Sequence, residues 1–394
     1  MEELKEGWRL ENLEENLEVI LDYRGKTPQK SEKGRVTLSA KSVKMGYIDY
    51  SNIYYVSEET YSKFMTRGLP KKGDILLTTE APLGCVAELK DDSVCLAQRL
   101  ITLRGKKEKL NNKYLLYYLQ SPRGQYELLS KATGTTVQGI KRTEFSKVKI
   151  LIPSLEKQNK IASILSSLDE KIELNRKINQ NLEEICQNYF LEIFIKNSNK
   201  NCSVGQISDL GNIVSGATPS KKNLKYYTNF GIPWITPKDL SKNFNKFISR
   251  GNLDITELGF KNSSVRLLPK GSVLFSSRAP IGYIAICSND VTTNQGFKSI
   301  VPFKNIGTEF VYYFLKNNVQ FLESRASGST FKEISTTIMA TTPAIIPKEE
   351  PLKVFKKICV NIFEKQYIIE KETEKLIELR DYLLPRLMSG EISV

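Results

Sequence analysis

The residues best suited to chemistry form two small, hydroxyl-rich stretches that lie 194 residues apart. They read ATGTTVQ at 132–138 and ASGSTFK at 326–332, and each has a central glycine and a long polar residue at its end. Hydroxyls, glycine N–H groups and a terminal Gln or Lys are good ligands for phosphate oxygens and for base edges. A helix N-cap uses the same Ser and Thr hydroxyls, and the two roles are compatible. The pattern therefore predicts a polar binding loop in each half of the chain.

A longer sequence match surrounds a position where the two halves carry opposite charges. Gly73–Gly84 (GDILLTTEAPLG) returns 198 residues later as Gly271–Gly282 (GSVLFSSRAPIG), and Glu80 stands where the second copy has Arg278. In the groove of a duplex, Arg favours guanine O6 and N7, whereas Glu accepts from cytosine N4. The hypothesis is that the two copies read different sequences partly through this pair. A solvated strand end is the other interpretation.

Several classes of active site are excluded by the residue types. The chain has no histidine, which rules out Ser-His-Asp and Cys-His nucleophiles, H-E-x-x-H metal sites and imidazole bases. Arg24–Pro28 (RGKTP) is not a nucleotide-binding loop, because that pattern requires glycine where Ile20 stands. Together with Ser215–Pro219 (SGATP), it is predicted to form a tight turn whose N–H groups and Thr hydroxyl suit a phosphate.

Signatures of cofactor binding and catalysis are also missing. There is no G-x-G-x-x-G, no amino-methyltransferase tetrad and no nuclease pattern, and the six cysteines show no C-x-x-C spacing. Carboxylate chemistry stays open as an option. The sequence predicts no catalytic residue, no bound metal and no cofactor in this chain.

The net charge of +14 is concentrated in two stretches. Residues 1–155 hold 26 Lys and Arg against 20 Asp and Glu, and residues 199–347 hold 17 against 8. The intervening 156–198 holds 6 against 7, and 348–394 holds 9 against 9. A polyanion is the natural partner of such basic bodies. On charge alone, solvated lysines without a ligand remain an equal alternative.

The repeat predicts an α+β protein made of two related modules, each followed by a long helix. The predicted domains are a first body at 1–155, a long helix within 156–198, a second body at 199–347 and a second long helix within 348–394. β-rich segments are expected at 36–38, 74–78, 94–103 and 148–152, and again at 272–276, 291–301 and 342–346. Short helices are expected at 111–121 and 309–317. Gly231–Leu240 (GIPWITPKDL) has no close copy in the first half; Trp234 is a candidate core residue, and Thr236, Lys238 and Asp239 are expected to be exposed.

Two apolar stripes at helical spacing predict that the long helices pair with each other, antiparallel, as a coiled coil. Asn175 and Asn179 lie near the seam, where a buried Asn can fix register; surface-facing Asn is the other interpretation. No apolar run approaches the roughly 18 residues of a membrane span, and the start lacks a signal-peptide core, so the cytoplasm is the expected compartment. The candidate seam residues are Ile161, Leu165, Leu168, Ile172 and Leu182 in the first helix and Ile358, Ile362, Ile369, Leu376, Leu379 and Leu383 in the second.

Taken in order, several short stretches resemble the specificity (S) subunits of type I restriction-modification enzymes over essentially the full chain. The supporting sequences are VSGATPS at 214–220, GIPWITPKDL at 231–240, SSRAPIG at 276–282, NQG at 294–296, GST at 328–330, IPSLEKQ at 152–158 and LLPRLMSGEI at 383–392. The resemblance implies two target recognition domains that each read one half of a split, asymmetric DNA site. It also implies helices that act as a ruler between the halves and dock two methyltransferase subunits, which bring S-adenosylmethionine. Motor-nuclease subunits would join for cleavage, and the S subunit itself would catalyse nothing.

Departures and rival interpretations limit what transfers. The first helix ends in YFLEIF rather than LxxLxxG, and the second opens with EEPLK rather than LEKQ, so docking at the two ends is expected to differ. The rivals are an orphan or phase-variable S-like adaptor, a single-chain methyltransferase or nuclease, and a protein-binding scaffold that never touches nucleic acid. No base-contact residue transfers from the family. From their types and positions, the candidate DNA-binding residues are Arg24, Lys26, Thr27, Thr79, Glu80, Gln98, Arg99, Gly134, Thr135, Thr136 and Gln138 in the first copy, and Thr218, Lys221, Lys222, Thr236, Lys238, Ser277, Arg278, Asn294, Gln295, Gly328, Ser329, Thr330 and Lys332 in the second.

Overall fold

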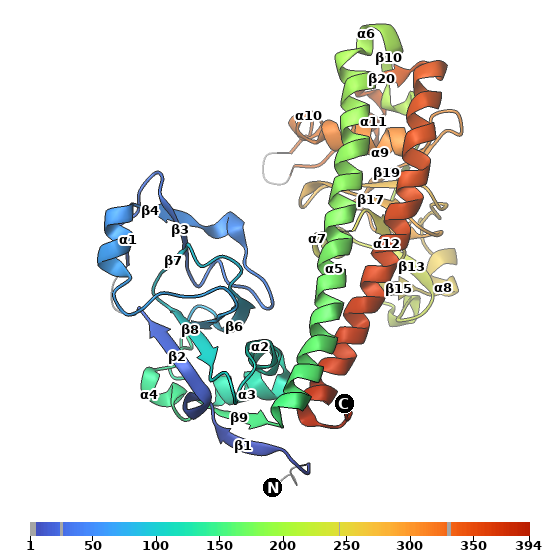
Figure 1. Cartoon of the computed structure of the whole chain (residues 1–394). Coiled ribbons are helices and arrows are strands. Elements are labelled where there is room, and N and C mark those ends of the chain that lie inside the picture. Colours follow the sequence, from blue (N-terminus) through green and yellow to red (C-terminus); the bar gives the residue numbers. More distant parts are fainter. Residues whose placement is uncertain (1–4, 24–26, 244, 329–331) are drawn as a thin grey trace. The chain divides into compact units, whose positions relative to one another are not determined.

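The computed structural model describes residues 5–23, 27–243, 245–328 and 332–394 (Figure 1). The chain forms two compact units. The first comprises Met1–Glu173 and Lys375–Val394, and the second comprises Leu174–Glu374. Each unit therefore contains one repeated body and a part of both long helices. None of the helices in the described residues is long and apolar enough to cross a membrane.

The body of the first unit is built on three sheets. A four-stranded sheet has the order β2-β8-β5-β6, a three-stranded sheet has the order β4-β3-β7, and β1 pairs with β9. The strands are β1 (Arg9–Asn12), β2 (Leu17–Asp22), β3 (Arg35–Leu38), β4 (Tyr54–Val56), β5 (Ile75–Thr79), β6 (Leu83–Glu88), β7 (Cys95–Leu96), β8 (Leu100–Gly105) and β9 (Lys149–Ile152). The helices are α1 (Glu58–Phe64), α2 (Asn112–Gln120), α3 (Pro122–Ser130) and α4 (Arg142–Phe145).

The body of the second unit repeats this plan with additions. Its large sheet has the order β11-β19-β16-β17-β14, its small sheet has the order β12-β15-β13-β18, and β10 pairs with β20. The strands are β10 (Cys202–Gln206), β11 (Gly211–Ser215), β12 (Tyr227–Thr228), β13 (Ile232–Ile235), β14 (Phe247–Ile248), β15 (Leu253–Ile255), β16 (Val273–Ser277), β17 (Ile281–Cys287), β18 (Thr292–Thr293), β19 (Lys298–Pro302) and β20 (Pro343–Pro347). The helices are α6 (Ser198–Asn201), α7 (Pro237–Lys242), α8 (Glu257–Lys261), α9 (Thr308–Asn317), α10 (Val319–Ser324) and α11 (Thr336–Thr341).

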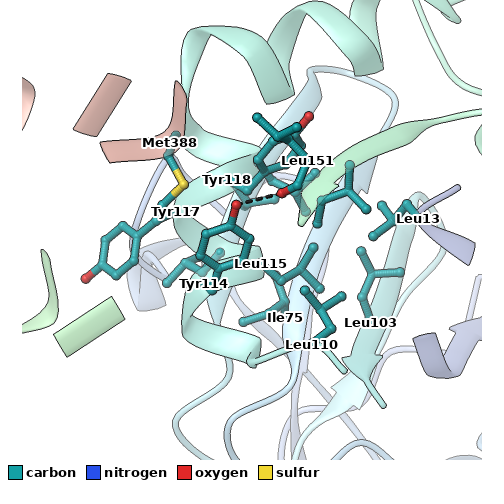
Figure 2. Packing of buried hydrophobic residues seen from close by; sticks show 14 of the residues in the cluster. Leu13, Ile75, Leu103, Leu110, Tyr114, Leu115, Tyr117, Tyr118, Leu151 and Met388 are labelled. Carbon is teal, nitrogen blue, oxygen red and sulfur yellow. Dashed lines mark hydrogen bonds between the residues drawn. The ribbon is translucent and has the colours of Figure 1, made fainter. Parts of the chain in front are cut away.

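The core of the first unit shows why its short helix forms where the sequence predicts it. The Asn111 side chain caps α2 by accepting from the backbone N–H of Tyr114 at 3.0 Å. All six residues from Tyr114 to Leu119 are buried. The Tyr114 hydroxyl reaches the Leu151 carbonyl at 2.6 Å, and the ring packs in the cluster with Ile75 and Leu103 (Figure 2). A buried hydroxyl with a partner avoids the cost of an unsatisfied donor.

Two stretches predicted as single β segments are each divided between two sheets. Residues 94–103 form β7 and β8, and residues 291–301 form β18 and β19. Between the strands the chain crosses from the small sheet to the large one, and Arg99 takes a positive φ of 70° at this crossing. Apolar composition predicts burial of such a stretch but carries no information about which sheet each half joins.

Strand pairing also reveals a counterpart that sequence similarity misses. β3 pairs antiparallel with β4 and parallel with β7, and β13 pairs antiparallel with β15 and parallel with β18. The segment at 231–240 therefore corresponds to residues 34–43, although the two share almost no residues. Hydrogen bonds of a sheet are made by the backbone, so pairing persists where side chains diverge.

The long helices are α5 (Leu155–Phe190), continued by a π-helical turn at Leu191–Lys196, and α12 (Glu349–Ser389). In the first unit Asp169 pairs with Arg380 at 3.0 Å. In the second, the Asn175 amide donates to Glu372 at 2.8 Å, and the Gln366 amide donates to the Asn179 carbonyl at 3.2 Å. The partner numbers fall as the α5 numbers rise, so the helices run antiparallel within each unit.

The predicted seam residues differ in how deeply they are buried. Asn175 is buried, so its surface-facing interpretation is wrong, while its role in fixing register stays a prediction. Leu379 is a correction, because its side chain is 45% exposed. It lies at the edge of the apolar stripe, one helical turn from both Leu376 and Leu383. Ile161, Leu165, Ile172 and Ile369 are buried, whereas Leu168, Leu182, Ile358, Ile362, Leu376 and Leu383 are half-buried.

Candidate nucleic-acid interface

In the second unit, the predicted tight turn is positioned by the ends of two strands. The backbone N–H of Ala217 donates to Thr293 at 2.9 Å, and the Trp234 indole donates to the Ala217 carbonyl at 3.0 Å. A Cβ on Gly216 would lie 1.9 Å from the Asn294 carbonyl oxygen, so only glycine allows this approach. The Thr218 hydroxyl bonds to the Gln295 side chain. The turn is therefore polar, and these contacts with neighbouring strands hold it in place.

The parallel pairing of β13 with β18 brings two more candidate residues to the same edge. The N–H of Asn294 donates to the Ile235 carbonyl at 3.0 Å, which places residue 294 beside Thr236. Thr236 and Asp239 are both half-buried, which corrects the expected exposure of these two residues. The Asp239 carboxylate accepts from the Thr236 N–H at 2.8 Å and from the Thr236 hydroxyl at 2.6 Å. These bonds form a capping box at the start of α7. Lys238 and Gln295 remain exposed beside them.

The hydroxyl-rich loop of the second unit meets the end of β16. The Ile334 N–H donates to the Ser277 carbonyl at 3.0 Å, and the Ser277 N–H donates to the Gly296 carbonyl at 2.8 Å. Ser277 is fully buried and its hydroxyl is used internally, so it is a correction to the candidate set. Gly328 and Lys332 are exposed, and Ser329 and Thr330 lie outside the described residues. Lys221 and Lys222 are exposed on the segment that follows the tight turn.

The first unit has the same arrangement of loops. The Thr79 N–H donates to the Arg99 carbonyl at 2.9 Å, and the Ile140 N–H donates to the Thr79 carbonyl at 2.9 Å. Thr79 is buried and is the second correction of this kind, while Gln98 is half-buried. Arg24 and Lys26 lie outside the described residues. The exposed candidates are Thr27, Arg99, Gly134, Thr135, Thr136 and Gln138.

The opposite charges at the end of β5 and of β16 each have an internal partner. Glu80 pairs with Arg99 at 3.4 Å, and Arg278 pairs with Glu333 at 3.2 Å. Lys298, nearly buried, also reaches Glu333 at 3.5 Å. Sequence reasoning missed Glu333, because nothing in the residue order shows that it lies opposite Arg278. Half-exposed pairs contribute only about 0–1 kcal/mol to stability, so a ligand that offers similar bonds competes with them.

On the expectation that each copy reads one half of a split DNA site, replacing Glu80 by Arg should change the preferred sequence of one half-site and leave the other unchanged. The variant places a guanidinium, which favours guanine O6 and N7, where the wild type has a carboxylate that accepts from cytosine N4. The double variant Glu80→Arg/Arg99→Glu keeps an ion pair of reversed polarity and controls for damage to the loop. Mapping modified bases after co-expression with a methyltransferase partner measures the result. An unchanged recognition sequence in both variants contradicts the hypothesis.

Comparison with known proteins places this arrangement in a family. The profile of the type I restriction modification DNA specificity domain matches residues 5–184 and again 199–379. The MjaIX specificity subunit of Methanocaldococcus jannaschii is 40% identical over 46% of this chain and 44% of its own length, so this chain matches less than half of that relative. The HindI specificity subunit of Haemophilus influenzae is 27% identical over 71% of this chain and 76% of its own.

A solved structure shows the same fold. The type I restriction-modification S subunit from M. genitalium superposes with a TM-score of 0.68 and covers 96% of both chains, at 17% sequence identity. The profile match covers most of the chain and occurs twice, once for each repeated body. The two bodies with their converging polar loops are thus two copies of one domain, and the chain belongs to the family of type I restriction-modification DNA specificity proteins.

Proposed function

We propose that this chain is the DNA sequence-recognition subunit of a type I restriction-modification system. Each body reads one half of a bipartite, asymmetric site. The observation that carries the proposal is the duplicated specificity domain, whose two copies hold all of the net positive charge. In the second copy, exposed polar residues gather where the tight turn, the strand ends and the hydroxyl-rich loop converge, and in the first copy the end of β5 meets the hydroxyl-rich loop in the same way. Cations that neutralise phosphates and polar groups that meet base edges are what duplex recognition requires.

The partners follow from the same assignment. The helices α5 and α12 dock two methyltransferase subunits, which carry S-adenosylmethionine, and motor-nuclease subunits join the complete enzyme. Apolar side chains exposed on α12, such as Val354, Ile368 and Tyr382, support a docking role for this helix. The chain itself catalyses no reaction, in keeping with a sequence that has no histidine and no catalytic signature.

One experiment separates this proposal from its rivals. The chain is co-expressed with the methyltransferase subunit encoded beside it, and modified adenines are mapped across the host genome. A single split sequence, modified only when both proteins are present, is the expected result. The purified complex should lose affinity for that duplex steeply as salt rises, because each neutralised phosphate contributes about −0.9 to the logarithmic slope. Methylation or cleavage by the chain alone would establish an enzyme, and a complex that does not bind the duplex even at low salt would support the scaffold.

A further inference from the structure

One aromatic side chain of the second unit stands out on the surface. Phe230 is 85% exposed and lies in the short turn between β12 and β13. Single exposed apolar residues are common on proteins and need no explanation by themselves. Phe230 differs from them in how its turn is held and in what surrounds it.

The turn that carries Phe230 is held in place by contacts with Asp254 and Arg250. The Gly231 N–H donates at 2.8 Å to Asp254, a buried carboxylate, which also pairs with Arg250 at 3.1 Å. Arg250 donates to the Asn229 carbonyl at 3.4 Å, and its guanidinium lies 5.9 Å from the centre of the Phe230 ring. A Cβ on Gly231 would lie 2.6 Å from the Ile255 carbonyl oxygen, so the turn fits closely on the sheet. The ring therefore projects from a fixed support.

The sequence on either side of the ring is strongly basic, although one of its lysines, Lys246, is buried and paired with Glu183. Residues 219–266 hold nine Lys and Arg against three Asp and Glu, and Lys221, Lys222 and Lys225 are all exposed. Proteins that kink DNA insert an apolar side chain between two neighbouring base pairs, while nearby cations neutralise the phosphates. An apolar ring flanked by lysines suits this role. The five residue steps from Gly231 along β13 to Thr236 span about 17 Å, less than one helical turn of a duplex, about 34 Å. A single duplex can thus meet both.

The first unit carries a different residue on the equivalent turn. Gly34 corresponds to Gly231 through the pairing of β3 and β13, and a Cβ on Gly34 would lie 2.1 Å from the Val56 carbonyl oxygen. Counting back one residue, Lys33 stands where the second unit has Phe230. The same close approach of a glycine to the neighbouring strand therefore follows a cation in one unit and an aromatic ring in the other, although Tyr55 stands where the second unit has Asp254.

We propose that Phe230 inserts between base pairs of the half-site bound by the second unit and unstacks them there, a role that Lys33 cannot perform in the first unit. The inference rests on the proposed DNA recognition and deepens it. Unstacking makes bending of the duplex easier at that step, so it favours half-sites with flexible steps even where no base edge is contacted.

The test uses the full chain in complex with its methyltransferase subunits and duplexes of the mapped site. Each adenine that is not itself a methylation target is replaced in turn by 2-aminopurine, whose fluorescence rises when it is unstacked. The target adenines are left in place because methyltransferases extrude them from the duplex. The wild-type complex should give a rise in one half-site only. Phe230→Ala should abolish the rise and weaken binding roughly tenfold, and Phe230→Trp should restore both. Phe230→Lys reproduces the first unit's turn, and it should abolish the rise while steepening the salt slope by about one.

Two controls make each outcome decisive. Leu224, 81% exposed in the same basic region, is replaced by Ala and should change neither signal. Lys33→Ala should leave the fluorescence rise intact. An unchanged rise in Phe230→Ala, or a wild-type complex that binds its site with no rise, overturns the wedge and leaves sequence recognition standing. A wild-type complex without preference for the mapped site overturns the proposed function itself.

Discussion

Replacing Lys246 by methionine is expected to lower the free energy of unfolding by about 3 kcal/mol. The Lys246 side chain is only 4% exposed in the second unit, where its Nζ lies 2.5 Å from Glu183. It also donates to Gln366 at 2.7 Å and lies 3.8 Å from the centre of the Phe363 ring. Replacing Lys246 leaves the largely buried Glu183 carboxylate with the half-exposed Lys316 as its remaining cation, and this weaker compensation accounts for most of the loss.

A matched variant separates burial from charge. Lys316 pairs with the same Glu183 carboxylate but is 40% exposed, so Lys316→Met is expected to cost less than 1 kcal/mol. The second change Glu183→Gln should recover part of the loss in Lys246→Met. Urea unfolding followed by Trp234 fluorescence, in a Trp8→Phe background, reports on the second unit. Equal losses from the two lysine variants would contradict the prediction.

The backbone at Lys246 also connects the body of the second unit to α12. It directly precedes β14, the edge strand of the large sheet in the second unit. The backbone N–H groups of Lys246 and Phe247 donate to the Glu370 carboxylate of α12 at 2.8 and 3.1 Å. The recognition body of this unit is thereby fastened to the segment of α12 within the same unit. In the first unit the corresponding loop has Gly46 and no buried lysine.

The stability of the second unit is expected to fall by about 3 kcal/mol as the pH rises from about 4.5 to about 7. Burial raises the pKa of Glu370 from 4.5 to about 7, against the opposing effect of the two N–H donors and the Lys246 ammonium. The neighbouring Glu374 carboxylate acts in the same direction as burial. Because the folded state holds the proton more tightly than the unfolded chain, this contribution is complete below pH 4.5. It is lost as the pH passes through about 7.

Glu370→Gln removes the titrating group and should flatten the stability profile between these pH values. Urea midpoints at pH 5 and pH 8 measure the difference for the wild type and the variant. Glu374→Gln, a change at a more exposed carboxylate, should leave most of the pH dependence in place. The prediction fails if the wild type is as stable at pH 8 as at pH 5, or if Glu370→Gln keeps the full difference.

Much of the architecture follows from the order of residues. The duplication, the short helices α2 and α9 and the strands β5, β9, β16 and β20 are local patterns of apolar spacing and turn residues, and the structure confirms them within one or two residues. The antiparallel pairing of the long helices is confirmed as well. Local patterns report which residues seek burial, so they carry this information without knowledge of distant contacts.

The candidate site was predicted less completely, because its members are fixed by contacts between distant segments. Thr79 and Ser277 share the composition of a polar loop, yet the crossing of the chain between sheets buries both. Glu80 and Arg278 differ in charge, and each pairs with a residue of opposite sign, Arg99 or Glu333, from a distant segment. No spacing rule connects these positions.

By itself, the sequence determined that this protein is a tandem repeat of basic α+β bodies with two amphipathic helices, and that imidazole chemistry is absent. Only the tertiary structure decided which polar groups are exposed, which charges are already paired, and that a lysine is buried beneath one body. The physical reason is that burial and pairing depend on which surfaces meet. Hydrophobic periodicity sets the elements, but the free energy of a charge depends on its neighbours in space.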